Sequence, residues 1–178
     1  MKKSLRLVMT LMVLIVTPLF ANAGQGRSIY FLLEGGQAWG EALSGPLASA
    51  KICLPLVGKL WLQAGYNHYF DPKVWNDPSG IKRSAFMLGL QFKGRERGRR
   101  LQWFVHCDGG SFRSNSRWYP DEFTSEFGFA LGGGLEKPLS ERIGLRCDLR
   151  AWSLYSGHVG FLSDEAWIET SLGFFYRL

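Results

Sequence analysis

The sequence predicts an all-β protein in which one antiparallel sheet of eight strands runs up and down and closes into a barrel. Three observations lead to this prediction. Apolar residues alternate with small or polar residues in segments of about ten, the two-residue period of strands. Turn-forming clusters separate the segments, and no window after Gly24 has the period of an amphipathic helix. The connections between segments alternate in length, which is typical of a barrel with two unlike rims.

The composition excludes several other classes of protein. The chain has 178 residues, of which 46% are hydrophobic and 20% are charged, with 22 Gly spread without a period. This apolar share is too high for a disordered chain, and aperiodic glycines exclude collagen. The length suits one domain. An odd number of cysteines (Cys53, Cys107 and Cys147) rules out a complete disulfide framework, so we interpret them as small apolar residues.

Residues 1–23 have the features of a secretory signal peptide. A basic start precedes an apolar stretch from Leu7 to Phe20, and Ala21 and Ala23 supply a small-x-small cleavage pattern. The apolar stretch is shorter than the ~20 residues of a membrane-spanning helix, so we favour a cleaved signal over an anchor. We therefore expect residues 24–178 to form the barrel domain.

Each of the eight expected strands is a run of alternating character that ends in turn-forming residues. In chain order they are Ser28–Trp39, Leu47–Leu54, Leu60–Phe70, Ser84–Lys93, Leu101–Asp108, Phe123–Gly133, Arg142–Trp152 and Ala166–Arg177. The short connections are Pro55–Lys59, Gly94–Arg100 and Glu136–Glu141, and Gly40–Pro46 is intermediate. The long connections are Asp71–Arg83, Gly109–Glu122 and Ser153–Glu165. An even strand count returns the chain end to the side where it began.

The two faces of the strands are most distinct late in the chain. In the fourth strand the apolar face carries Phe86, Leu88, Leu90 and Phe92, opposite Ala85, Met87, Gly89 and Gln91. In the seventh strand it carries Ile143, Leu145, Cys147, Leu149 and Ala151, opposite Arg142, Gly144, Arg146, Asp148 and Arg150. In the last strand it carries Ile168, Thr170, Leu172, Phe174 and Tyr176, opposite Trp167, Glu169, Ser171, Gly173 and Arg177.

The polar faces carry charges of both signs that neighbouring strands bring together. Folding the first two strands about their connection places Glu34 roughly opposite Lys51, and folding the last two brings Arg150 near Glu169. The third, fourth and sixth strands contribute mainly small and amide side chains. Small residues and paired charges suit a crowded lumen, because isolated buried charges are costly. We predict a structural network in the lumen formed by Glu34, Lys51, His106, Asp108, Glu126, Arg146, Asp148, Arg150 and Glu169.

An apolar face that covers the outside of a closed sheet must meet hydrocarbon, so the sequence predicts a transmembrane β-barrel. Aromatic residues gather in two bands, as in the interfacial girdles of such barrels. The band at the long-loop ends contains Trp39, Tyr69, Phe70, Trp152 and Trp167, and the other contains Tyr30, Trp61, Trp103 and Tyr176. With about eight strands, side chains fill the interior, so we expect no open pore.

The end of the chain resembles the terminal strand signal of outer-membrane β-barrel proteins. The run Ser171–Tyr176 has that signal's order of polar, any, Gly, hydrophobic, any and aromatic residues, although Arg177 and Leu178 follow it. The stretch Gly132–Arg142 resembles the strand-turn-strand of small eight-stranded outer-membrane β-barrels. The resemblance implies a Gram-negative outer membrane, contact with its lipid and lipopolysaccharide, and insertion by the barrel-assembly machinery. The implied assembly signal consists of Ser171, Gly173, Phe174 and Tyr176.

The function predicted from these features is a structural or surface-interaction role in the cell envelope, with no cofactor or metal. The long connections project from a rigid scaffold, where recognition usually occurs. They supply the candidate surface-recognition residues Trp75, Arg113, Arg117, Trp118 and Tyr119. An exported chain without a basic helix gives no reason to expect a nucleic-acid partner, and we interpret the basic run at 93–100 as a solvated turn.

Two alternatives remain open at this point. The first is a lipid A-modifying acyl hydrolase or acyltransferase, because such enzymes occur among small outer-membrane barrels. The deacylases of that kind carry His-x-Ser-Asn at the end of the penultimate strand. The matching region of this chain, from Trp152 to His158, does not contain that motif. His106 and Asp108 share a face, as a catalytic His–Asp pair would, yet no serine is placed beside them. The second alternative is a secreted lipocalin-like carrier, in which the apolar face points inward around a ligand.

Overall fold

The structure, a computed structural model, describes residues 28–40, 43–70, 82–94, 101–115, 123–155 and 166–178. These residues form eight strands: β1 (Tyr30–Gly40), β2 (Gly45–Val57), β3 (Leu60–Tyr69), β4 (Lys82–Lys93), β5 (Gln102–Asn115), β6 (Phe123–Pro138), β7 (Ile143–Tyr155) and β8 (Ala166–Arg177). In this described part, no helix is long and apolar enough to cross a membrane. The expected signal peptide, residues 1–23, lies outside the described residues.

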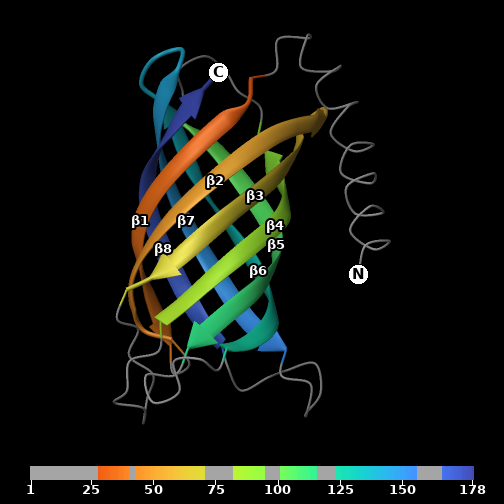
Figure 1. Cartoon of the computed structure of the whole chain (residues 1–178). Coiled ribbons are helices and arrows are strands. Elements are labelled where there is room, and N and C mark those ends of the chain that lie inside the picture. The colour runs from red at the N-terminus through yellow and green to blue at the C-terminus, as the bar shows by residue number, and fades with distance from the viewer. Residues whose placement is uncertain (1–27, 41–42, 71–81, 95–100, 116–122, 156–165) are drawn as a thin grey trace.

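The eight strands pair consecutively and antiparallel, and the sheet closes where β1 pairs with β8 (Figure 1). The closing register places Leu33 opposite Phe174. Closure leaves no unpaired strand edge. The predicted eight-stranded up-and-down barrel is therefore confirmed. We call the rim where β1 begins and β8 ends the short-turn rim, and the opposite rim the long-loop rim.

Four strands extend beyond their predicted ends, and one of them is β7, which continues from Trp152 to Tyr155. β2 continues from Leu54 to Val57 despite a register shift after Pro55, which has no N–H to donate. β5 continues from Asp108 to Asn115, and β6 from Gly133 to Pro138. The prediction ended β5 before the glycines at 109–110 and β6 at Gly133, whereas it ended β2 before Pro55.

The glycines near those predicted ends are instead points of close approach between strands. A Cβ at Gly134 would lie 1.9 Å from the carbonyl oxygen of Cys147 on β7. A Cβ at Gly110 would lie 3.2 Å from the Trp152 ring. By contrast, Gly58 in the β2–β3 turn has a φ of 56°, the left-handed conformation that favours glycine. Glycine therefore has different roles in the wall and in the turns.

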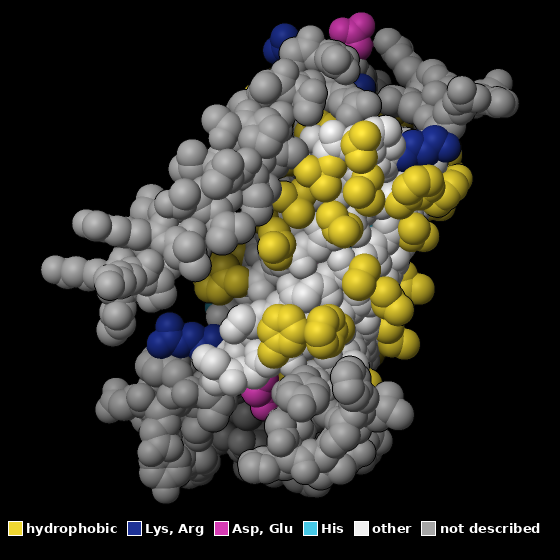
Figure 2. Space-filling view, turned by 90° about the vertical axis from the view of Figure 1, so that its right-hand side faces the viewer, with side chains coloured by type: hydrophobic (Ala, Val, Ile, Leu, Met, Phe, Trp, Pro, Cys, Tyr) yellow, Lys and Arg dark blue, Asp and Glu magenta, His cyan; other side chains and the backbone are white. Residues whose placement is uncertain are grey.

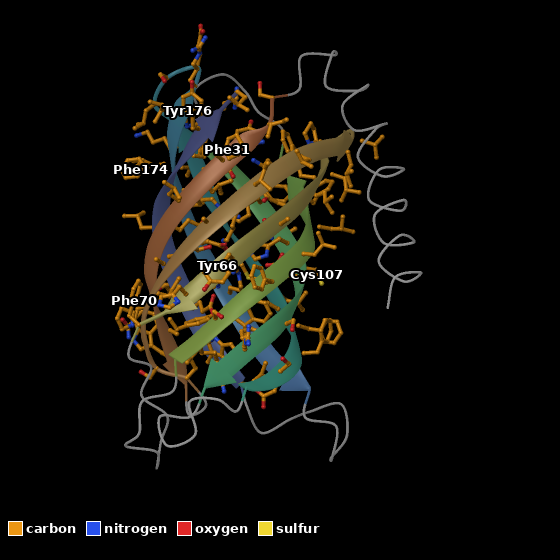
Figure 3. The ribbon with its side chains drawn as sticks, in the orientation of Figure 1. Phe31, Tyr66, Phe70, Cys107, Phe174 and Tyr176 are labelled. Carbon is orange, nitrogen blue, oxygen red and sulfur yellow. The ribbon has the colours of Figure 1, made fainter. Side chains whose placement is uncertain are left out.

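The outer wall is apolar along its whole circumference. Large hydrophobic side chains are exposed on all eight strands, and most lie in alternation with buried polar residues. In Figure 2 they cover the visible wall, while charged side chains lie toward its two ends. Phe31, Phe174 and Tyr176 point outward near the short-turn rim, and Phe70 does so near the other rim (Figure 3). This arrangement is the reverse of a water-soluble protein, in which the apolar side chains are enclosed.

The lumen is filled with side chains in three layers. At the short-turn rim, Tyr30, Leu32, Cys53 and Phe175 pack together with Trp61 against them. Charged and amide side chains occupy the middle layer. Toward the long-loop rim lies an apolar cluster made of Ala38, Leu43, Leu47, Tyr69, Ala85, Met87, Phe112, Ala130, Trp152, Leu154 and Trp167. The middle layer is therefore enclosed by apolar groups on both sides.

Candidate functional site

The charged middle layer is organised around Asp148 on β7. Its neighbours Arg146 and Arg150 share its inward direction because they lie two residues away along the strand. Arg150 Nη2 donates to Asp148 Oδ2 at 2.8 Å, and Lys51 Nζ on β2 lies 3.4 Å from the same oxygen. His106 Nε2 on β5 lies 2.9 Å from Asp148 Oδ1. One carboxylate thus connects three strands across the barrel.

His106 has a carboxylate on each side of its ring. Besides the contact with Asp148, its Nδ1 lies 2.8 Å from Asp108 Oδ2. Both ring nitrogens donate together only when the imidazole carries two protons. The Asp108 carboxylate also accepts a hydrogen bond from the Gln63 amide, and its Oδ2 lies 3.6 Å from Arg150 Nε. His106 is therefore held in place by β5 and β7 together.

Arg146 connects Asp148 to the short-turn side of the lumen. Its Nε lies 3.1 Å from Glu34 Oε1, and its Nη1 donates to Glu136 Oε1 at 2.8 Å. The guanidinium carbon lies 3.6 Å from the centroid of the Phe104 ring, a cation–π contact. The buried positive charge of Arg146 is therefore balanced by the carboxylates of Glu34 and Glu136 and by the Phe104 ring.

Lys93 completes the network at the short-turn rim. Its Nζ donates to Glu136 Oε2 at 2.8 Å and lies 4.0 Å from the centroid of the Tyr30 ring and 4.7 Å from that of Trp61. On the other side of the network, Glu34 also forms an ion pair with Lys51. The ionic layer thus reaches the aromatic residues that close this end.

Glu169 on β8 ends the network toward the long-loop rim. Arg150 Nη1 lies 3.6 Å from Glu169 Oε2, and the Trp167 indole donates to Glu169 Oε1 at 2.9 Å. Tyr69 and Asn67 on β3 also donate to this carboxylate. An acid facing the lumen is thereby satisfied by one cation and three neutral donors.

Three aromatic rings cover the ionic layer on its long-loop side. The rings of Trp152 and Trp167 stack with centroids 6.0 Å apart and planes at 18°. The Phe112 ring packs edge-on against both, at 4.9 and 5.3 Å. With the Tyr30 and Phe175 cluster at the other rim, these rings leave the charged residues enclosed from both ends.

The enclosed charges are balanced among the described residues. The buried cations are Lys51, Arg83, Lys93, Arg146 and Arg150, and the buried anions are Glu34, Asp108, Glu136, Asp148 and Glu169. Because buried charges without partners are strongly destabilising, this equality is what a sealed lumen requires. The ion pairs connect strands across the barrel interior.

The predicted network residues all lie on the lumenal side, with two differences in detail. Glu34 was expected roughly opposite Lys51, but its register partner is Ser49, and Lys51 lies opposite Leu32. The charges meet diagonally, because long side chains reach a residue two positions along the neighbouring strand. Glu126 lies apart from the central cluster near the long-loop rim, where its side chain is 28% exposed and lies 3.7 Å from Arg83 Nη2.

Several network residues were missed by sequence reasoning. Glu136 was assigned to a turn because β6 was ended at Gly133, and Lys93 was treated as the end of a strand. The two-residue alternation contains the missing signal: Gln91 and Lys93 continue the inward series of β4, and Glu136 continues that of β6. The other lumenal polar residues that the predicted network did not name are Ser49, Gln63, Asn67, Tyr69, Arg83 and Gln102, although the amides of the third strand were expected to face the lumen.

The predicted aromatic girdles are wrong for five residues. Tyr30, Tyr69, Trp152 and Trp167 are buried in the lumen, and Trp61 packs against the lumenal Tyr30 cluster, instead of lying on the wall. The reason is alternation, since each shares its face with inward polar residues on its own strand. The remaining girdle residues include Trp39, Phe70, Trp103 and Tyr176, which are exposed on the wall.

The candidate recognition residues lie mostly beyond the described part of the chain. This applies to Trp75, Arg117, Trp118 and Tyr119, as well as to His158. Arg113 was assigned to a long loop, but it lies within β5 and is exposed on the wall side, because β5 extends past the glycines at 109–110. In the assembly-signal segment, Phe174 and Tyr176 are exposed on the wall, Gly173 is buried against β1, and Ser171 is half-buried.

The described residues form no recognisable catalytic or metal centre. Both nitrogens of His106 are engaged by carboxylates, so its ring is not presented to a nucleophilic hydroxyl. Among the residues described, no group of three or more His, Cys, Asp or Glu side chains could hold a metal ion. Cys107 and Cys147 are exposed on the apolar wall as predicted, and Cys107 projects from it in Figure 3. The inward-facing apolar surface that a lipocalin-like carrier requires is replaced by an ionic layer.

No protein-family model matches the sequence, and no curated protein sequence matches it. Solved structures do match the fold. Neisserial surface protein A is similar with a TM-score of 0.67 and 16% sequence identity, over 84% of this chain and 97% of that one. The N-terminal β-barrel domain of OprF from Pseudomonas aeruginosa is similar with a TM-score of 0.63 and 13% identity, over 85% of this chain and 98% of that one.

A designed protein also matches. A structure from the de novo design of transmembrane β-barrels is similar with a TM-score of 0.51 and 11% identity, over 85% of this chain and 95% of that one. These similarities establish that the fold is a small eight-stranded β-barrel of the outer-membrane type.

Proposed function

We propose that this chain is an integral outer-membrane protein with a structural or surface-interaction role in the cell envelope, without catalysis and without an open pore. One observation carries the proposal: large apolar side chains cover the outside of a closed sheet while a balanced set of charges is sealed within it. In water this arrangement would expose far more contiguous apolar surface than a soluble monomer tolerates. In a bilayer the same surface is the favourable one.

The dimensions of the wall support a membrane position. A tilted strand needs about 9–11 residues to cross the hydrocarbon layer, and the shortest strand of this barrel has 10. Closure satisfies the backbone N–H and C=O groups between strands, which a bilayer demands because it offers no water. The exposed Trp39 and Phe70 lie near one rim and Trp103 and Tyr176 near the other, where amphipathic rings meet head groups.

The proposal includes the route to the membrane. Residues 1–23 act as a cleaved signal peptide in a Gram-negative host, and the barrel-assembly machinery recognises the last strand through Ser171, Gly173, Phe174 and Tyr176. The outward exposure of Phe174 and Tyr176 supports this role, since both rings are accessible on the wall. Replacing Tyr176 with Ala should lower the amount of folded protein in the outer membrane, whereas Tyr66→Ala, away from the last strand, should not.

The surface-interaction role is assigned to the long connections. Trp75, Arg117, Trp118 and Tyr119 combine aromatic and cationic side chains that suit lipopolysaccharide or a partner at the cell surface, and Arg113 is exposed on β5. The filled lumen supports this assignment, because contacts with other molecules must then be made by the outer surface of the protein. No cofactor or nucleic acid enters the proposal.

Membrane fractionation with heat-dependent gel mobility tests the proposal most directly. The mature protein should be found in the outer-membrane fraction and migrate faster before boiling than after it, because a closed barrel resists detergent until heated. A protein that remains monodisperse in buffer without detergent would contradict the proposal. An unchanged lipid A mass spectrum with and without the gene is expected, and a changed spectrum would instead favour an enzyme.

A further inference from the structure

The outer wall is not uniformly convex. A hollow of about 690 Å³ lies over β1–β4, between an aromatic and aliphatic ridge on β1 and another on β3 and β4. Its outward-facing lining includes Phe31, Leu33, Ala50, Ala64, Tyr66 and Phe86. We call this hollow the wall groove. Leu32, Lys51 and Met87 also line it, but they are buried on the lumenal face, so the wall groove and the ionic network lie on opposite faces of the same sheet.

The strand register explains why the groove exists. In one row across the sheet, Leu33 lies opposite Ala50, and Ala50 lies opposite Tyr66. In the next row toward the short-turn rim, Ile52 lies opposite Ala64, and Ala64 lies opposite Leu88. An alanine beside large residues leaves a gap in each row. The two gaps adjoin on β2 and β3, so together they form a track that follows the strands.

The track continues toward the long-loop rim and becomes polar there. In the following row Gly35 lies opposite Ala48, and Ala48 lies opposite His68. A Cβ added at Gly35 would meet nothing within 4 Å, so the surface is open at this point. The His68 ring stacks on Tyr66, with centroids 6.4 Å apart, and packs edge-on against Phe70 at 4.7 Å. Within the described residues, the ring makes no hydrogen bond.

An apolar groove with polar side chains beyond one end suits a ligand that has an apolar chain and a polar head. Gln37, one row beyond Gly35 on β1, is half-buried like His68, so an amide and an imidazole lie toward the long-loop rim beyond this groove. The outward side chains of the groove itself offer hydrocarbon and the ring of Tyr66. In Figure 3, Phe31 lies nearer the short-turn rim and Tyr66 nearer the long-loop rim, and the strand register places them in adjacent rows of the wall.

We propose that the wall groove binds one acyl chain of a membrane lipid, with the lipid head group beside His68 and Gln37 and the chain end near Phe31. This inference rests on the proposed membrane position. Elsewhere on the wall, large side chains make dispersion contacts with one another. A bound acyl chain would supply those contacts at the gaps left by Ala50 and Ala64. The polar head then meets the imidazole and the amide at the interface, where His68 is held between two aromatic rings.

The test is photo-crosslinking of the full mature protein in vesicles. The vesicles are made of phosphatidylcholine with a small fraction of phosphatidylethanolamine that carries a diazirine in one acyl chain. After illumination, the labelled peptides are identified by mass spectrometry. Labelling of peptides from β2 and β3 should exceed labelling of β7 several-fold. A diazirine close to the head group should label near Ala48, and one at the chain end should label near Phe31.

Ala50→Phe fills the groove and should abolish the excess labelling of β2 and β3. Ala151→Phe makes the same change at an outward-facing alanine on β7 and should leave that excess intact. Heat-dependent gel mobility confirms that each variant is folded before labelling, and Ala50→Leu replaces Ala50→Phe if the latter does not fold.

Three outcomes would overturn the proposal. Equal labelling of all strands would show that lipid does not prefer the groove. Protection of β2 and β3 with crosslinks to a second chain would show that another copy of the protein fills it. Reversed positions of the two diazirines would refute the stated orientation. If the proposed membrane position itself fails, no strand of the wall is labelled, so the two failures are distinguishable.

Discussion

His106 on β5 and Asp148 on β7 contact each other across the intervening strand, with Nε2 2.9 Å from Oδ1. The strand between them is β6, and Gly132 occupies the position opposite His106. A Cβ on Gly132 would lie 2.5 Å from His106 Nε2 and 2.7 Å from the carbonyl oxygen of Leu149. The absence of a side chain at this position is what allows the two residues to meet.

Gly132→Ala should therefore destabilise the barrel. The new methyl group must displace the His106 ring or the β7 backbone, and overpacking of this kind costs about 1–3 kcal/mol. The free energy of unfolding is measured by urea titration in detergent micelles. Gly35→Ala is the matched control, because a Cβ there meets nothing within 4 Å and its effect should stay within about 0.5 kcal/mol. Equal effects of the two substitutions would refute the role given to Gly132.

Arg146→Leu tests the ionic layer. The substitution removes the cation between Glu34 and Glu136 and leaves both carboxylates short of compensation. Breaking a buried pair by removing one partner costs about 3–5 kcal/mol. Arg146→Lys keeps the charge and should cost less. Arg142→Leu in the exposed β6–β7 turn should have little effect on the same unfolding curve, and a comparable loss at position 142 would contradict this account.

The enclosed lumen predicts that the protein does not conduct ions. Phe112, Trp152 and Trp167 cover the ionic layer on one side, and the Tyr30 and Trp61 rings pack with Lys93 on the other. Purified protein added to a planar lipid bilayer should therefore give no discrete conductance steps. A sixteen-stranded porin, whose wider barrel leaves an aqueous channel, is the positive control. Regular steps from this protein at comparable concentration would show that the layers open.

Alternation along the strands was the part of the structure that the sequence predicted best. The outward series of β4, from Phe86 to Phe92, and the inward series of β7, from Arg146 to Arg150, follow from the two-residue period alone. The closure of eight strands follows from connections that alternate in length. These features depend on local pattern, which a single sequence contains.

Register and strand length were harder to predict, since both depend on neighbouring strands. The contact between Glu34 and Lys51 was expected, but their offset by two positions in the strand register was not. Long side chains can form an ion pair in either register, so the pairing of charges does not determine the register. The extension of β6 to Pro138 was missed because a glycine that accommodates a neighbouring strand has the same sequence signal as a glycine in a turn. Glu136 was lost from the predicted network for that reason.

The solvent outside the barrel determines the effect of a charge placed on the wall. Leu131 lies midway along β6 and is 68% exposed, and Leu139 lies just beyond the same strand at the short-turn rim and is 50% exposed. Arginine is compatible with either position if the wall faces water, since neither side chain is enclosed. If the wall faces hydrocarbon, the two positions differ in depth, because the centre of the strand lies far from the head groups.

Leu131→Arg should therefore lower the free energy of unfolding by about 2–4 kcal/mol in phospholipid vesicles, and Leu139→Arg by about 0–1 kcal/mol. The two variants add the same side chain and the same charge, so a difference between them does not come from net charge. Reversible urea unfolding in vesicles, followed by tryptophan fluorescence, gives both values. Equal and small losses would mean that the apolar wall meets water, and the membrane position inferred from the reversed polarity of the barrel would then be wrong.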